Sequence, residues 1–254
     1  MSGRARVVIV QNSPGSGPGR LPGWLVDEQI DAVIVAGDDL PGRLADVGDQ
    51  ADGLVLLGGG FMPDDDERAP FLPRERAIVG EAVEAGVPVL GICLGAQLLA
   101  LVGGGEVTAQ SGETEKGFCR VDLLAAAADD ELFAGLAELA GSGGDAGDDP
   151  DGGLRMMQNH KDSITRLPAD AVHLGTSAAC DVEAFRLGRS AWGVQFHPEA
   201  PAERIAEWDV AQLMTDGFDR SQLLADAMAH AEANTRQARA LVGAFAAVVR
   251  ERRR

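Results

Sequence analysis

The sequence predicts an α/β protein whose core is a doubly wound, mostly parallel sheet, followed by a C-terminal helical extension. First, strand-like and helix-like segments alternate through the N-terminal part of the chain, an order that produces parallel strands joined by crossover helices. Second, the apolar runs are short and β-branched, as in strands buried on both faces. Third, 201–254 is Ala-rich and helical in composition. We therefore expect one domain at 1–200 and helices at 201–254 packed on or beside it.

The individual elements follow from local composition and from their punctuation. β-branched apolar runs predict the strands, and apolar residues at helical spacing predict the helices. After Gly105 the strands shorten and lose the helices between them. A Gly/Asp-rich stretch at 141–153 predicts a mobile loop without a function of its own. In chain order the sequence predicts strands at 6–11, 32–35, 53–57, 87–92, 119–124, 171–176, 182–187 and 191–196, with helices at 24–29, 74–85 and 94–102.

The overall composition excludes several classes of protein. The chain has 254 residues and a formal net charge of −18, which opposes general nucleic-acid binding. The first apolar run is too short for a signal peptide. Three cysteines without C-x-x-C spacing indicate neither a disulfide framework nor a zinc site. We therefore expect a cytoplasmic protein that binds no nucleic acid or membrane and needs no metal or other cofactor.

The most apolar stretch of the chain contains a cysteine. The segment 85–105 has no charged side chain, and Cys93 lies in its middle, within G-I-C-L-G. Such a segment can be a membrane span, the site of a buried structural cysteine, or the site of a nucleophile. Pro88, Gln97 and six glycines interrupt the segment, which argues against a span. The structural cysteine and the nucleophile remain as alternatives.

The neighbours of Cys93 favour the nucleophile. If a strand ends at Ile92 and a helix begins at Leu94, Cys93 occupies a tight elbow that needs small flanking residues. The elbow also places the sulfur at a helix N-terminus, where the helix dipole stabilises a thiolate.

A cysteine nucleophile needs a base, and His197 is the best candidate among the four histidines. It ends a predicted strand, in WGVQFHPEA, so it can project from the same rim of the sheet as Cys93. Glu199 follows two residues later, and in extended chain that spacing puts both side chains on one face. The carboxylate can then accept from Nδ1–H and leave Nε2 facing the sulfur. His160, in QNHKD, is predicted to lie in a polar turn that can line a site.

These two motifs together resemble those of a known family. G-I-C-L-G-A-Q around Cys93 and G-V-Q-F-H-P-E around His197 are similar to the signatures of the triad-type (class I) glutamine amidotransferases, which have a flavodoxin-like core. GGGF, from Gly58 to Phe61, occupies the position of the oxyanion loop of the family. The resemblance covers about 5–200, and the layout is most similar to the glutaminase domain of GMP synthetases.

The resemblance implies a role for each matching residue. Cys93 would attack the side-chain amide of L-glutamine and form a γ-glutamyl thioester, with His197 as the proton carrier oriented by Glu199. The oxyanion donors would be backbone N–H groups, those of Leu94 and of Gly60 or Gly59. Gln97 would help to hold the substrate. His160 matches a loop histidine near the site, where coupling is a more fitting role than chemistry.

The resemblance leaves the physiological reaction open. Too few residues follow Glu199 for an ATP-pyrophosphatase or other acceptor domain. The sequence therefore predicts a stand-alone glutaminase that supplies ammonia to a separate synthetase, or a hydrolase of another γ-glutamyl amide that needs no partner. A non-enzymatic interaction protein on the same scaffold is the third alternative, and the intact set of Cys93, His197 and Glu199 argues against it.

Overall fold

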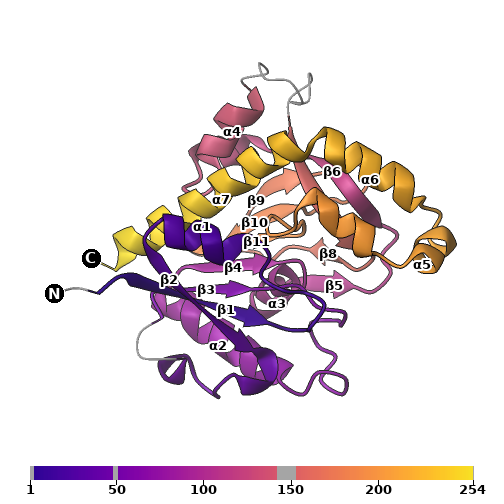
Figure 1. The fold of residues 1–254 in the computed structure, drawn as a ribbon. Helices are drawn as coiled ribbons and strands as arrows, with labels where there is room; N and C mark the ends of the chain where they lie inside the picture. The colour runs from indigo at the N-terminus through magenta and orange to yellow at the C-terminus, as the bar shows by residue number, and fades with distance from the viewer. Residues whose placement is uncertain (1–2, 48–50, 142–152, 254) are drawn as a thin grey trace.

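A large curved sheet forms the centre of the molecule, as the computed structural model of residues 3–47, 51–141 and 153–253 shows (Figure 1). Its nine strands lie in the order β2 (Ile30–Ala36), β1 (Ala5–Gln11), β3 (Gly53–Leu56), β4 (Val89–Ile92), β11 (Ala191–Val194), β10 (Ala184–Leu187), β9 (Ala171–Thr176), β6 (Glu115–Leu123) and β7 (Leu154–His160). The first five strands in this order run parallel, and the rest are antiparallel to their neighbours.

Alternate residues of the parallel strands pack against helices on opposite faces of this sheet. Val7 and Ile9 belong to a core with α1 (Leu21–Asp27) and α7 (Ala231–Arg252). Val8 and Val10 belong to a second core with α2 (Leu72–Ala85) and α3 (Leu94–Val102). This alternation is the period of two that a pleated strand imposes, and it makes the strands apolar on both faces. The predicted doubly wound fold is confirmed.

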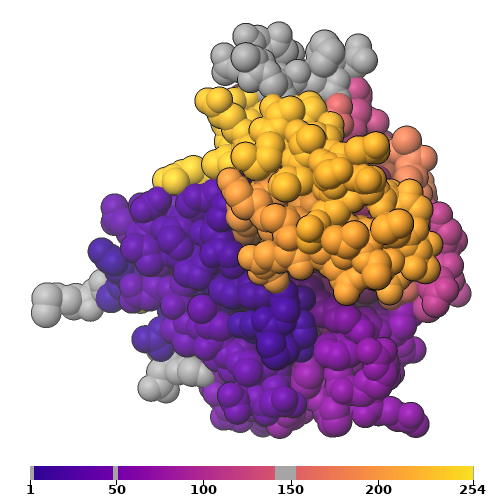
Figure 2. Space-filling model, turned by 45° about the vertical axis from the view of Figure 1, so that its right-hand side comes forward, coloured from indigo at the N-terminus to yellow at the C-terminus, as the bar shows by residue number. Residues whose placement is uncertain are grey.

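The segment after residue 200 is helical and lies against the sheet domain. It contains a 3₁₀ helix η4 (Ala202–Glu207), α5 (Val210–Thr215), α6 (Arg220–Ala229) and the long α7. Leu241 and Phe245 of α7 are buried in the same core as Trp192 of β11. Figure 2 shows this segment, in orange and yellow, as a continuous cap beside the indigo N-terminal part. A boundary between two domains at residue 200 stays a prediction.

The smaller elements lie at the edges of the sheet. They are the 3₁₀ helices η1 (Gly37–Asp39), η2 (Leu44–Asp46) and η3 (Ala125–Asp129), the helix α4 (Ala134–Gly141), and a two-stranded sheet of β5 (Glu106–Thr108) and β8 (Ser163–Arg166). The predicted Gly/Asp-rich loop at 141–153 lies almost entirely outside the described residues.

Several predicted element bounds were wrong in a consistent way. α1 and α2 begin at Leu21 and Leu72, earlier than predicted, because Pro22 and Pro73 occupy the first turn, where proline is tolerated. The polar turn predicted around His160 is instead the end of β7. Its pairing with β6 sets Glu115 opposite His160, a contact between distant parts of the chain that local composition does not reveal.

Candidate active site

The predicted nucleophile and base follow two adjacent strands. Cys93 comes directly after β4 and His197 shortly after β11, and these strands pair in parallel with Ile92 opposite Val194. The N–H of Cys93 donates to the carbonyl of Val194 at 2.8 Å, which locks the elbow to the neighbouring strand. Carboxyl ends of parallel strands are where such sheets bind ligands. The fold therefore brings Cys93 and His197 to one rim.

The elbow at Cys93 depends on two glycines. Cys93 has φ of 52° and ψ of −107°, an unfavourable backbone conformation for a residue with a Cβ. A Cβ on Gly91 would lie 2.5 Å from the carbonyl of Gly95, and one on Gly95 would lie 2.2 Å from the carbonyl oxygen of Leu56. The turn from β4 into α3 is therefore possible only with glycine at both positions, as the sequence predicts.

His197 is held by the carboxylate of Glu199. The Nδ1 atom of His197 lies 2.7 Å from Oε1 of Glu199, so Nδ1–H donates to the carboxylate and Nε2 is left for the sulfur. Burial alone would lower the pKa of His197. The charge of Glu199 and hydrogen bonds with Cys93 and Glu199 outweigh burial and raise that pKa well above its ordinary value. The imidazolium form is thus stabilised beside the thiol.

Arg20 is a positioning residue that the sequence did not reveal. Its guanidinium donates to the carbonyls of Pro198 and Ala200, at 2.9 and 3.2 Å, and to Asn234 Oδ1 at 2.9 Å. Burial lowers the pKa of Arg20 to about 10, against the opposing charges of Glu199 and Glu203, so the group stays charged at neutral pH. Arg20 lies at the end of a Gly/Pro-rich loop, where no motif distinguishes it.

The glycine loop after β3 lies against the Cys93–His197 pair. A Cβ on Gly58 would lie 3.0 Å from Cε1 of His197 and 3.7 Å from Cβ of Cys93. A Cβ on Gly59 would lie 2.6 Å from Cδ2 of Leu94, whereas Gly60 has open space at that position. Gly58, which the sequence did not single out, is therefore the glycine in direct contact with the pair.

A buried acid supports the approach to this loop. Asn12, after β1, donates through Nδ2 to the carbonyl of Leu57 at 3.0 Å and to Oε1 of Glu75 at 3.2 Å. Glu75 lies on α2 and is fully buried. Burial raises the pKa of Glu75 to about 8, although the hydrogen bond from Asn12 and the charge of Arg76 oppose the shift. The carboxyl group is therefore mostly protonated at neutral pH.

Two glutamine side chains connect Cys93 with the far side of the site. Nε2 of Gln97, on α3, donates to the carbonyl of Asp162 at 3.1 Å and to Oε1 of Gln195 at 3.4 Å. Nε2 of Gln195 in turn lies 3.6 Å from the sulfur of Cys93. Gln195 belongs to the same motif as His197, yet its contact with the sulfur could not be read from the sequence.

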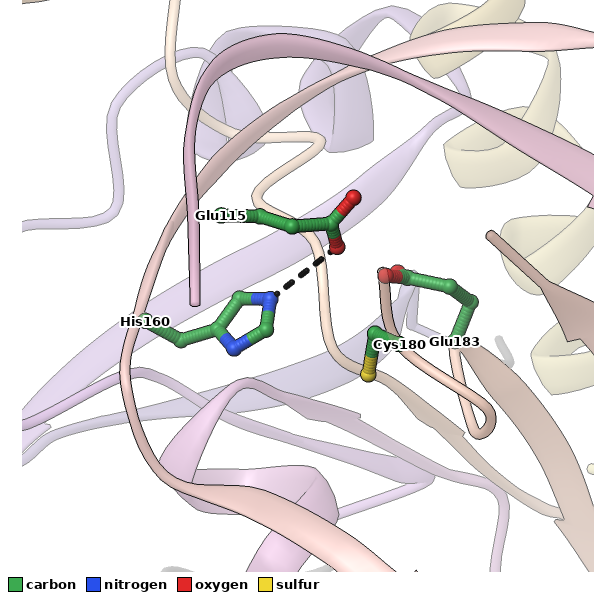
Figure 3. A group of neighbouring side chains, drawn as sticks. All are labelled: Glu115, His160, Cys180 and Glu183. Atoms are coloured by element: carbon green, nitrogen blue, oxygen red, sulfur yellow. Dashed lines mark hydrogen bonds and ion pairs between the residues drawn. The ribbon is translucent and has the colours of Figure 1, made fainter. Parts of the chain in front are cut away.

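His160 lies in a separate buried cluster rather than beside the imidazole of His197 (Figure 3). Its Nε2 is 3.3 Å from Oε2 of Glu115, and Cys180 and Glu183 complete the group. Burial, and then the adjacent Glu115, raise the pKa of Glu183 well above its ordinary value. Burial opposes a low pKa for Glu115, but hydrogen bonds from His160, Glu183 and Ser177 lower it. The two carboxyl groups therefore share a proton.

A cavity of about 450 Å³ opens beside the base. His197 and Glu199 form one wall, and the loop at 15–19 and η4 form others. Trp208 and Met157 supply apolar surface, and Glu203 and Glu207 supply carboxylates. The cavity can hold a small molecule that has both apolar and cationic parts.

A doubly wound sheet that gathers a cysteine, a histidine and a glutamate at neighbouring strand ends defines an α/β protein of the cysteine-nucleophile type. The family model "Glutamine amidotransferase class-I" matches residues 32–205. The chain belongs to the class-I glutamine amidotransferase family, as the two motifs predicted.

Curated relatives and solved structures agree with this assignment. The chain is 32% identical over 58% of its length to a glutamine-hydrolysing GMP synthase subunit of Methanothermobacter thermautotrophicus, and this match covers 65% of that relative. It is 34% identical over 65% of its length to the glutamine-hydrolysing GMP synthase of Xanthomonas axonopodis pv. citri, of which it covers only 28%. The chain therefore spans less than two thirds of either relative.

The solved structure of a glutamine amidotransferase from Thermotoga maritima has the same fold. It aligns with a TM-score of 0.78 over 96% of this chain and 98% of that one, at 24% identity. Within the described residues, no helix is both long and apolar enough to cross a membrane.

Proposed function

We propose that this protein hydrolyses the side-chain amide of L-glutamine through a thioester on Cys93, and that it supplies the ammonia to a separate synthetase. The observation that carries the proposal is the arrangement of Cys93, His197 and Glu199 at the ends of β4 and β11. The relative from Methanothermobacter thermautotrophicus, a glutamine-hydrolysing part of a GMP synthase, supports the choice of substrate and of a separate partner.

Each residue has a defined step in this reaction. The thiolate of Cys93 attacks the amide carbon, forming a C–S bond, and His197 gives its proton to the departing ammonia. A water molecule, deprotonated by His197, then attacks the thioester, and the C–S bond breaks to release glutamate and the thiolate. Glu199 holds the imidazole in the tautomer that both steps need.

The developing oxyanion needs backbone donors at the same rim. Leu94 begins α3, so its N–H has no partner within the helix and lies at the positive end of the helix dipole. A second N–H would come from Gly59 or Gly60, on the loop that contacts His197 and Leu94. One such donor contributes about 3–4 kcal/mol to transition-state stabilisation. Gln97 and Gln195 would hold the substrate, and His160 would act through the wall that they form.

The cavity beside His197 favours a second candidate, hydrolysis of a γ-glutamyl amide with an amine leaving group. Its carboxylates, Glu203 and Glu207, and the ring of Trp208 suit an ammonium group at the end of an apolar chain. The chemistry at Cys93 would be the same, but no partner would be needed.

Measuring product release by the purified protein separates the two candidates. Ammonia release from glutamine that is slow alone and faster with a synthetase partner supports the glutaminase. Fast hydrolysis of γ-glutamyl amines, with little response to glutamine, supports the second candidate. Cys93→Ala should abolish either activity, and any turnover that survives in this variant would contradict both.

A further inference from the structure

The cluster of Glu115, His160, Cys180 and Glu183 in Figure 3 has a composition that the glutaminase reaction does not explain. Glu115 begins β6 and His160 ends β7, while Cys180 and Glu183 lie in the connection from β9 to β10. All four are at least nine-tenths buried, with Cys180 and Glu183 at 0% exposure. One potential ligand atom from each lies within 4.8 Å of the other three.

The two carboxylates of the cluster face each other without an observed donor between them. Figure 3 shows the carboxyl group of Glu183 pointing toward that of Glu115. Among the described residues, no hydrogen-bond partner reaches Oε1 of Glu183 or Nδ1 of His160. Two carboxylates buried face to face need a cation between them, either a proton or a metal ion.

We propose that these four side chains form a structural zinc site. A thiolate, an imidazole and two carboxylates are the donor types that Zn²⁺ prefers, whereas Mg²⁺ and Ca²⁺ take oxygen ligands. Tetrahedral zinc with bonds of about 2.0–2.3 Å separates its ligand atoms by about 3.3–3.8 Å. The side chains therefore close in on the ion by rotamer adjustment, without movement of the strands. Four protein ligands leave no open position, so the site is structural.

Charge balance is compatible with this exchange. Zinc binding displaces the proton shared by Glu115 and Glu183 and the thiol proton of Cys180, and both go to solvent. One divalent cation then replaces two protons, so the net charge of the buried group does not change.

Surrounding hydrogen bonds orient the carboxylates toward the proposed ion. Ser177 donates to Oε1 of Glu115 at 2.9 Å, and Gln158 donates to Oε2 of Glu183 at 2.6 Å. These contacts leave the opposing oxygens for the metal, which is the arrangement that outer-shell partners of metal ligands provide. The four ligands come from distant positions, which explains why spacing in the sequence indicated no zinc site.

Metal titration of the full chain tests this proposal independently of glutamine hydrolysis. Cys93→Ala serves as the parent protein, so that Cys93 and His197 cannot bind the metal. After treatment with a chelator and dialysis, the parent should take up about one equivalent of Zn²⁺ and unfold at a higher temperature. Co²⁺ in place of zinc should produce a thiolate-to-metal charge-transfer band. Absence of stoichiometric binding and of the band would overturn the proposal in favour of a shared proton.

Matched cysteine variants locate the metal. Adding Cys180→Ser to the parent should remove the charge-transfer band and the stoichiometric binding. Adding Cys119→Ser should retain both, because Cys119 is a half-buried thiol on β6 outside the cluster. A band that persists without Cys180 would overturn the site. If Cys180→Ser does not fold, Glu183→Gln, which keeps the thiol, should still abolish stoichiometric binding, and full binding by it would overturn the proposal equally.

Discussion

At the scale of single residues, the environment of each ionisable group determines its chemical role. Glu199 and Glu75 are both buried glutamates, but Glu199 accepts a hydrogen bond from an imidazole, whereas Glu75 accepts only a neutral amide N–H. The first stabilises a cation on His197, and the second is driven toward its neutral form.

Removing the charge of Glu199 should change the pH profile of turnover as well as its rate. The raised pKa of His197 keeps the imidazolium protonated to higher pH, and the leaving ammonia needs that proton. Glu199→Gln should therefore shift the alkaline limb of kcat/KM to lower pH and reduce turnover by roughly 10²–10⁴-fold. Glutamine hydrolysis measured across pH checks both effects. Glu203→Gln, on the cavity wall, is the control, and an alkaline limb that does not move in Glu199→Gln would contradict the role of the carboxylate.

Glu75 should make the protein less stable as pH rises. Its folded pKa of about 8 lies above its ordinary value of 4.5, so its stabilising contribution is complete below pH 4.5 and is lost as pH rises toward 8. Glu75→Gln should remove this loss and raise the free energy of unfolding at pH 9 by a few kcal/mol, on the order expected from linkage. Urea unfolding at pH 5, 7 and 9 measures it. Glu84→Gln, exposed on the same helix, should retain the slope. Parallel stability curves for wild type and Glu75→Gln would exclude the effect.

At the scale of elements, the position of the nucleophile depends on how closely α3 approaches β3. Gly95 of α3 touches the backbone of Leu56, so the helix axis cannot lie at this distance with any other residue there. The close approach fixes the elbow and, with it, the direction of the Cys93 side chain.

Two Gly→Ala variants in neighbouring helices should have opposite effects. Gly95→Ala places a Cβ 2.2 Å from the carbonyl oxygen of Leu56, and we expect it to destabilise the protein by about 1–3 kcal/mol and to impair turnover. Gly80→Ala, in α2, meets only Val102 at 3.7 Å and should stabilise by about 0.5–1 kcal/mol. Thermal and urea unfolding of both variants measure this difference. Equal effects would mean that helix propensity, rather than the close approach, controls both sites.

The elements that the sequence predicted are those set by local pattern. The β4–Cys93–α3 unit was predicted almost to the residue, because a β-branched run, flanking glycines and helical spacing all lie within it. β7 was missed, and His160 was placed in a turn, because that strand depends on its pairing with β6. The contacts of Arg20 and Gln195 were missed for the same reason: their partners are brought together only by the fold.

At the scale of the whole molecule, α7 is part of the main core. Phe245 is fully buried with side chains of β1, α1 and β11. Truncation to Phe245→Ala should cost about 3–5 kcal/mol of unfolding free energy. Glu251→Ala, on the exposed side of the same helix, should change it by less than about 0.5 kcal/mol. A separate early unfolding transition in Phe245→Ala, with the sheet intact, would instead show that the segment after residue 200 is an independent unit.

The hydrogen bonds of Arg20 create an energetic linkage between the two ends of the chain. One guanidinium holds the turn that carries Glu199 and also the first turn of α7, through Asn234 and Thr235. A protein that docks on this part of α7 and displaces Asn234 would loosen the orientation of the catalytic base without touching the glutamine site. Because such coupling is reciprocal, a substrate that fixes the base also strengthens the grip on α7. The surface over the first turn of α7 is thus a place where a partner can regulate ammonia production from a distance.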